Sequence, residues 1–182
     1  GSVAAIPEPP SSPAAASPAA EPEPQPVVQT VRFSATGDNL IHSPIYKQAK
    51  RRAAGTEGYS FDYCYEHIAP FYAQQDVNWI NQETLCTDEL EPSTYPCFST
   101  PGDCARALYR AGVRVFSLSN NHTYDKGASG IAATLRFWGS MPEDVVTTGL
   151  WKGEIDYGRI PMQTVNGVTI AYLSYTEHTN GI

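Results

Sequence analysis

The 182-residue sequence contains no run of about eighteen apolar residues, so no segment of it is expected to cross a membrane. It is also poor in positive charge, with 12 Lys and Arg against 19 Asp and Glu, and its formal net charge is -7. The only basic cluster is Lys50-Arg51-Arg52, which we interpret as the solvated face of a short helix. Nucleic-acid-binding proteins carry clustered positive charge, so a nucleic-acid partner is not expected.

The four cysteines lack the Cys-x-x-Cys spacing of a structural zinc site. They are Cys64, Cys86, Cys97 and Cys104. In a chain that resembles exported proteins, an even number predicts two disulfides. We expect Cys86–Cys97 and Cys64–Cys104, because each bond would pin a loop close to the polar strand ends described below. The alternative is that the cysteines are buried free thiols, as in cytosolic proteins.

The N-terminal segment has no aromatic residue and consists mostly of Ala, Pro, Ser and Glu. Such a composition cannot bury enough apolar surface to offset the entropy of ordering, so residues 1–28 are expected to form a disordered linker. Gly1-Ser2 matches a cloning remnant. The linker resembles the stalk of an extracellular domain. We therefore expect an extracytoplasmic location at the cell surface, with a membrane or lipid anchor on a removed N-terminal segment.

Residues 29–182 are expected to form one domain, since a chain of this length with 41% hydrophobic residues can build a core. Strands are predicted at residues 27–35, 76–80, 113–116 and 144–148, helices at 45–54, 103–111 and from 125 or 129 to 139, and a hairpin at 161–165 and 168–175 around Asn166-Gly167. Asp103 is expected to cap the second of these helices and Asp125 or Ser129 the third, and residues 84–101 are expected to form a long loop. The alternation of strands and helices predicts a layered α/β domain with a largely parallel or mixed sheet.

Polar residues follow three of the expected strands. Asp38 follows the first strand, with His42 close by, Glu83 follows the second, and Asn121-His122 follows the third. Ligands bind beyond the carboxyl ends of strands in open α/β sheets, so we expect these side chains to converge. Their oxygen and nitrogen donors suit manganese, zinc or iron. The sequence predicts a site for one or two divalent metal ions, bound by Asp38, Glu83, Asn121 and His42, with His122 as the catalytic proton donor.

Each of these residues also has a structural interpretation. Asp38 after Gly37 is typical of a turn, and Asn120-Asn121 of left-handed turn conformations. A single histidine is often only a hydrogen-bonding residue. Their recurrence at three strand ends favours a site, because function concentrates in loops on a rigid scaffold.

The same residues lie in motifs that resemble a known family. The motifs are Thr36-Gly37-Asp38, Asn81-Gln82-Glu83-Thr84, the run from Leu118 to Gly127, and Thr179-Asn180-Gly181. Together they resemble the poly-gamma-glutamate capsule biosynthesis family of the CapA type, a branch of the calcineurin-like metallophosphoesterases. The resemblance covers roughly residues 31–182.

The resemblance implies a layered α/β metallophosphoesterase-like sandwich, of which this sequence is expected to be only the N-terminal part. It also implies that Asp38 and Asn121 bind metal, that Glu83 stands where a bridging carboxylate is expected, and that His122 is the catalytic histidine. His42 departs from the pattern, since it follows Asp38 by four residues where the superfamily has two.

The implied function is that of a metal-dependent hydrolase-like protein in the making, export or anchoring of anionic capsule polymer. Its target would be a phosphoester or a gamma-glutamyl amide bond, and membrane synthase components would be further partners. Two alternatives stay open: a non-catalytic component that binds or assembles polymer, and a metallophosphoesterase acting on a small phosphoester. An anionic polymer requires compensating positive charge on an acidic protein, and four arginines could supply it. They are Arg106, Arg110, Arg114 and Arg136.

Overall fold

A four-stranded parallel sheet lies at the centre of the domain, with the strand order β1-β2-β5-β6. Its strands are β1 (Phe33–Asp38), β2 (Val77–Asn81), β5 (Val115–Ser117) and β6 (Val146–Thr148). The computed structural model describes residue 1, residues 27–154 and residues 156–180. The parallel sheet with its helices confirms the predicted α/β fold class. Most of the predicted linker, residues 1–28, lies outside the described residues.

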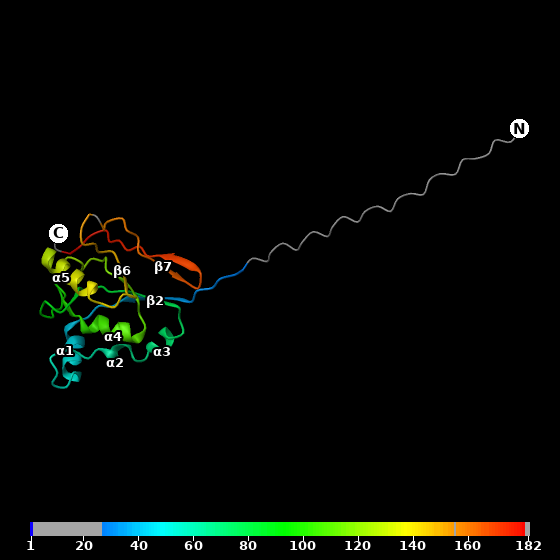
Figure 1. Cartoon of the computed structure of the whole chain (residues 1–182). Coiled ribbons are helices and arrows are strands. Elements are labelled where there is room, and N and C mark those ends of the chain that lie inside the picture. The colour runs from blue at the N-terminus through cyan, green and yellow to red at the C-terminus, as the bar shows by residue number, and fades with distance from the viewer. Residues whose placement is uncertain (2–26, 155, 181–182) are drawn as a thin grey trace.

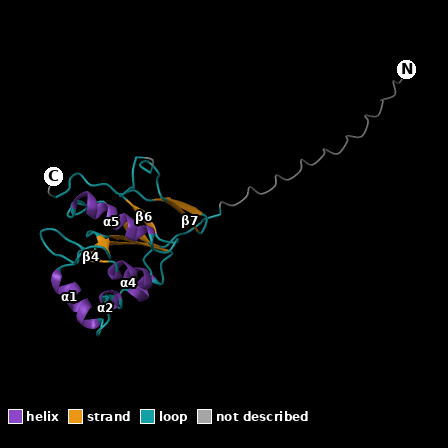
Figure 2. Cartoon of the chain, turned by 60° about the vertical axis from the view of Figure 1, so that its left-hand side comes forward, coloured by secondary structure: helices purple, strands orange, loops and turns teal. Residues whose placement is uncertain are grey.

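Helices connect the strands and cover one face of the sheet. They are α1 (Ser43–Arg52), α2 (Asp62–Tyr65), α3 (Ala69–Tyr72), α4 (Asp103–Ala111) and α5 (Gly127–Gly139). Figures 1 and 2 show α1, α2 and α4 together on one side of the sheet. None of the helices in the described part of the chain is long and apolar enough to cross a membrane.

Alternate residues of the strands form two apolar clusters on opposite faces of the sheet, as the two-residue period of a strand requires. Ile80 and Phe116 belong to the larger cluster, which the helices complete. Val77 and Val115 belong to a smaller cluster under Tyr172. The predicted hairpin, formed by β7 (Met162–Val165) and β8 (Val168–Ala171), lies on this second side (Figure 1).

Turn residues in the sequence correctly marked the end of α4 and the turn of the hairpin. Gly112 ends α4 with a φ of 112°, and Asn166-Gly167 turns the hairpin with φ values of 50° and 79°. The predicted first strand, residues 27–35, begins too early, because the strand propensity of a segment does not show where its pairing with a neighbouring strand begins. The backbone N–H of Arg32 donates to the Asp76 carboxylate, and ladder pairing with β2 starts only at Phe33.

Two predicted helix caps are wrong. Asp103 is the first residue of α4, and its carboxylate accepts a hydrogen bond from the Tyr59 backbone N–H. The cap position of α5 is Lys126, without a side-chain capping bond, because the Asp125 carboxylate bonds to other partners. The long loop expected at residues 84–101 contains two short strands, β3 (Cys86–Thr87) and β4 (Thr100–Pro101), which pair in parallel.

The predicted disulfides Cys86–Cys97 and Cys64–Cys104 are not formed, and all four cysteines, each within the described residues, are free thiols. Each predicted pair would join a buried cysteine to an exposed one. Cys104 lies in the core, where its sulfur contacts the Tyr65 hydroxyl at 3.1 Å and Asn39 Nδ2 at 3.4 Å. Burial raises the pKa of the Cys104 thiol to about 11, so it stays protonated at neutral pH.

Thiol accessibility tests this correction. In the native protein, the exposed Cys64 and Cys97 are expected to react with a chromogenic aromatic disulfide, whereas Cys86 and Cys104 are expected to react only after unfolding. Partial burial raises the pKa of the Cys64 thiol, which slows its reaction. A Cys64→Ser variant serves as the control and should lose one of the thiols that react before unfolding. Absence of any free thiol after denaturation without reductant would instead restore the disulfide prediction.

Candidate active site

The polar ends of three strands meet at one edge of the sheet, as predicted. Asn81 Nδ2 donates to Asp38 Oδ1 at 2.7 Å, which joins the ends of β2 and β1. The Gln82 backbone N–H donates to the Ser117 carbonyl at 2.9 Å, and Asn120 Nδ2 donates to the Gln82 carbonyl at 3.2 Å. Because β1, β2 and β5 are parallel neighbours, their carboxyl ends lie at the same rim.

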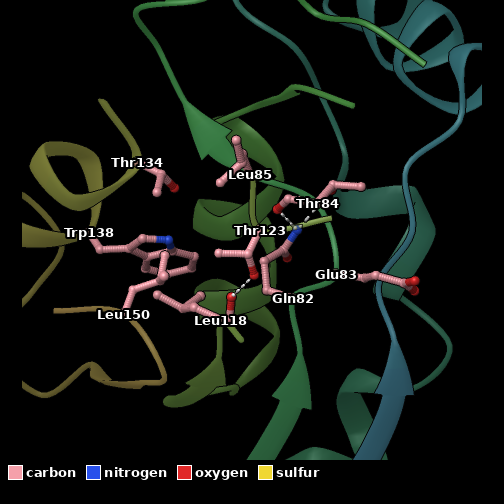
Figure 3. Close-up of a pocket in the computed structure, with 9 residues that line it drawn as sticks. All are labelled: Gln82, Glu83, Thr84, Leu85, Leu118, Thr123, Thr134, Trp138 and Leu150. Carbon is pink, nitrogen blue, oxygen red and sulfur yellow. Dashed lines mark hydrogen bonds between the residues drawn. The ribbon is translucent and has the colours of Figure 1, made fainter. Parts of the chain in front are cut away.

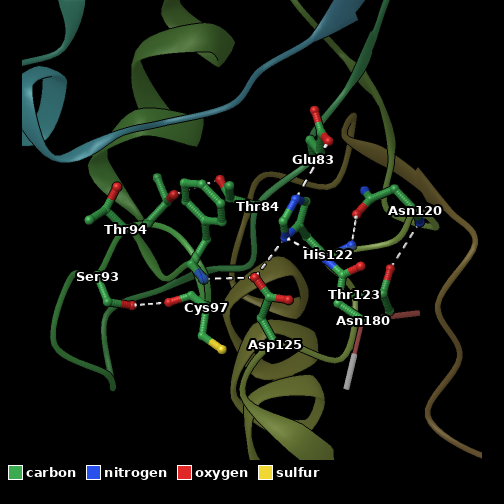
Figure 4. A network of polar contacts seen from close by, with 12 residues as sticks. Glu83, Thr84, Ser93, Thr94, Cys97, Asn120, His122, Thr123, Asp125 and Asn180 are labelled. Atoms are coloured by element: carbon green, nitrogen blue, oxygen red, sulfur yellow. Dashed lines mark hydrogen bonds and ion pairs between the residues drawn. The ribbon is translucent and has the colours of Figure 1, made fainter. Parts of the chain in front are cut away.

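His122 lies at the centre of this rim, in the turn that follows β5 (Figure 4). Its Nδ1 is 2.8 Å from Asp125 Oδ2, and its Nε2 is 3.9 Å from Glu83 Oε1. An ionised carboxylate only accepts hydrogen bonds, so Nδ1 donates its hydrogen to Asp125. In the neutral imidazole, Nε2 then carries the lone pair and faces Glu83.

Asp125 is a residue that the sequence analysis missed as part of the site, because it was considered only as a helix cap. Its side chain is 1% exposed, and its Oδ2 also accepts a hydrogen bond from the Phe98 backbone N–H at 2.7 Å. The sequence did contain a signal for this contact, the spacing His-x-x-Asp, because two residues three positions apart in a turn have neighbouring side chains. Asp125 therefore fixes the tautomer and orientation of the His122 ring.

Glu83 is a partly desolvated carboxyl group with an acidic neighbour. Its side chain is 13% exposed. Burial raises the pKa of Glu83, the nearby Asp38 raises it further by charge and hydrogen bonding, and His122 opposes the shift. Positive charge beside Glu83 would oppose this shift by favouring the ionised carboxylate.

The donors around Asp38 fit a divalent cation in their chemistry. Asp38 and Glu83 supply carboxylate oxygens, and Asn81 Oδ1 is buried without a hydrogen-bond partner. Oxygen donors of this kind suit manganese or magnesium. No cluster of three His, Cys, Asp or Glu side chains able to hold a metal occurs in the part of the chain that the structure describes. With only two carboxylates at this position, Asp38 and Glu83 would hold a metal together with the Asn81 amide oxygen.

The other two predicted metal ligands have different surroundings. The Asn121 carbonyl accepts a hydrogen bond from the Asn180 backbone N–H at 2.7 Å. His42 is exposed; its Nδ1 lies 3.2 Å from Thr94 Oγ1, and its ring packs edge-on against Phe98 with the centroids 5.0 Å apart. His42 thus packs against the long loop, and its role as a metal ligand stays a prediction.

Asn180 is a further residue of the site whose role the sequence analysis did not assign. Its Nδ2 lies 3.2 Å from His122 Nδ1. Since that nitrogen already donates its hydrogen to Asp125, the amide makes a polar contact there. The C-terminal motif therefore packs directly on the turn that carries His122.

Behind Glu83 lies a small cavity of about 10 Å³, lined by side chains that include Gln82, Thr134 and Trp138 (Figure 3). That volume holds about one water molecule. Figure 3 shows the Glu83 carboxylate pointing away from Trp138 and Leu150, which line the cavity.

The parallel sheet and the helices that cover it make this an α/β domain of the metallophosphoesterase-like type. Residues 32–182 match the family model described as bacterial capsule synthesis protein PGA_cap. The chain belongs to this family, as the sequence motifs had indicated.

Two curated relatives have capsule-related names. The chain is 29% identical over 124 residues to "Capsule biosynthesis protein CapA" of Bacillus anthracis, covering 65% of this chain and 30% of that protein. It is 26% identical over 147 residues to "PGA biosynthesis protein CapA" of Bacillus subtilis (strain 168), covering 79% of this chain and 37% of that protein. The chain thus corresponds to a minor part of each relative's length.

Proposed function

We propose that this chain carries the acid–base part of a metal-dependent hydrolase that acts on anionic capsule polymer at the cell surface. The observation that carries the proposal is the placement of His122 between Glu83 and the buried Asp125, at distances of 3.9 Å and 2.8 Å. A histidine oriented by a carboxylate is a common proton-transfer group in hydrolysis. The capsule-related names of the relatives supply the substrate class.

The residues of the site have distinct chemical roles in this proposal. Asp125 holds the Nδ1 hydrogen of His122 and stabilises the imidazolium that forms when Nε2 takes a proton from the water molecule that attacks the substrate. The charged imidazole then returns that proton to the leaving nitrogen or oxygen. Asp38 and Glu83 would hold a divalent metal ion, which when bound would lower the pKa of water and polarise the bond to be cleaved.

The four arginines suggested as polymer-binding residues are already paired with carboxylates. Arg106 pairs with Asp88 and Asp103, Arg110 with Asp62, Arg114 with Asp144, and Arg136 with Glu89. Their charges are therefore largely compensated within the chain. A bound cation at Asp38 and Glu83 would instead supply local positive charge for an anionic substrate.

Hydrolysis assays with and without metal test this function. The purified chain is stripped with a chelator, reloaded with manganese or zinc, and assayed on poly-gamma-glutamate and on a chromogenic phosphate monoester. Metal-dependent cleavage is expected, and Asp38→Asn is expected to abolish it. Asp62→Asn, which changes a surface carboxylate paired with Arg110, is the matched control and should retain activity.

Each alternative function has its own result in these assays. Cleavage of the phosphate ester alone would identify a small-substrate phosphoesterase. Retention of the polymer on the immobilised chain, with no cleavage under any metal condition, would replace the hydrolase with a polymer-binding component.

A further inference from the structure

The loop between β3 and β4 reaches the site through one residue, Phe98. This residue is 1% exposed although it follows the exposed stretch of Tyr95, Pro96 and Cys97. None of the roles proposed above includes it. Its contacts nevertheless lead directly to His122 and Asp125.

The first contact is a backbone hydrogen bond. The Phe98 N–H donates to Asp125 Oδ2 at 2.7 Å, and the same oxygen accepts the Nδ1 hydrogen of His122 at 2.8 Å. A buried carboxylate needs hydrogen-bond donors from the protein to offset the cost of its burial. The loop thus supplies one of the two hydrogen bonds that orient Asp125.

The second contact is made by the ring. Phe98 packs edge-on against His122, with ring centroids 4.8 Å apart and an interplanar angle of 84°. Its ring also packs edge-on against His42. Close packing against one edge restricts rotation of the His122 ring about its side-chain torsions. Phe98 therefore keeps Nδ1 directed toward Asp125 and Nε2 toward Glu83.

The loop is constrained well enough to hold Phe98 in place. Ser93 and Ser99 exchange two backbone hydrogen bonds, at 3.0 and 3.2 Å, and close the segment at its base. Ser93 Oγ donates to the Cys97 carbonyl at 2.7 Å (Figure 4). Thr94 Oγ1 contacts both His42 and the backbone N–H of Ser43, which ties the loop to the start of α1.

We propose that Phe98 is a positioning residue for the His122–Asp125 pair, and that the loop of residues 93–99 is the element that positions it. The inference rests on the proposed function for its chemical purpose, since an oriented imidazole is useful only if His122 transfers protons. It assigns His42 to the support of Phe98, in place of the metal-binding role that the sequence suggested.

The hydrogen bond of His122 provides a readout that does not require turnover. In protein labelled with ¹⁵N-histidine, the Nδ1–H shared with Asp125 is expected to give a slowly exchanging, low-field proton resonance, identified by its absence in His122→Gln. Phe98→Leu keeps an apolar residue but removes the flat ring, and Phe98→Ala removes the packing altogether. Both are expected to lose the resonance through faster exchange. In the same variants, kcat should fall roughly ten- to a hundredfold with little change in KM.

A matched control separates positioning from general loss of stability. Phe61 is also a fully buried phenylalanine; it lies in the larger apolar cluster, and its ring is stacked on Tyr59 with the centroids 6.2 Å apart. Phe61→Leu should lower the unfolding temperature yet retain the resonance. A resonance unchanged in both Phe98 variants, or absent from the wild-type protein, would overturn the proposal. If the resonance behaves as expected but no substrate is cleaved, the hydrolase proposal fails and the positioning contact stands.

Discussion

A His122→Gln variant is expected to lose hydrolytic turnover by a factor of roughly 10² to 10⁴, the usual contribution of a general acid–base residue. Glutamine places an amide near the position of Nε2, but an amide cannot take up and return a proton there. The loss should therefore appear in kcat, measured with whichever of the two substrate classes the wild-type chain cleaves. Circular dichroism should show that the variant retains its fold.

The control for this experiment is His67→Gln. The His67 side chain is 96% exposed and lies on the surface next to Glu66, so its replacement should leave turnover unchanged. Equal kcat values for wild type and His122→Gln would remove His122 from catalysis. Asp125→Asn provides a second check, because an amide in place of the carboxylate would weaken stabilisation of the imidazolium and should lower kcat in the same direction.

A Phe116→Ala variant is expected to lose about 3–5 kcal/mol of the free energy of unfolding, the usual cost of removing a buried aromatic side chain. Phe116 is fully buried on β5, and its ring centroid lies 4.7 Å from that of Trp138 on α5. The substitution leaves a cavity between a central strand and the helix that covers it. Denaturant titration at neutral pH measures the loss.

Phe71→Ala is the matched control, since Phe71 is 51% exposed on α3. Its substitution should cost far less, because the ring already contacts solvent. Similar losses for the two variants would show that Phe116 does not have the packing described for it.

The sequence predicted only part of the site, because it shows which residues follow a strand but not which distant segments fold against them. Asp38, Glu83 and His122 were predicted to lie close together because each follows a strand, and parallel strands bring their carboxyl ends to one rim, where these side chains lie. Their roles in the site stay predictions. Phe98 was not found, because it comes from the long loop. The role of Asp125 was also missed, since its polar side chain fitted helix capping equally well. Helix-capping propensity does not show which hydrogen-bond donor a carboxylate binds when several donors lie close to it.

The amino-acid sequence alone determined four features of this protein: the α/β class, the end of α4 at Gly112, the Asn166-Gly167 hairpin and membership of a capsule-related family. These features depend on periodicity, turn residues and short motifs, all of which act over a few neighbouring positions. The tertiary structure decided the four free thiols, the start of β1, and the packing of His42 and His122 against Phe98. Burial and contacts between distant segments control these features, and they exist only once the chain has folded.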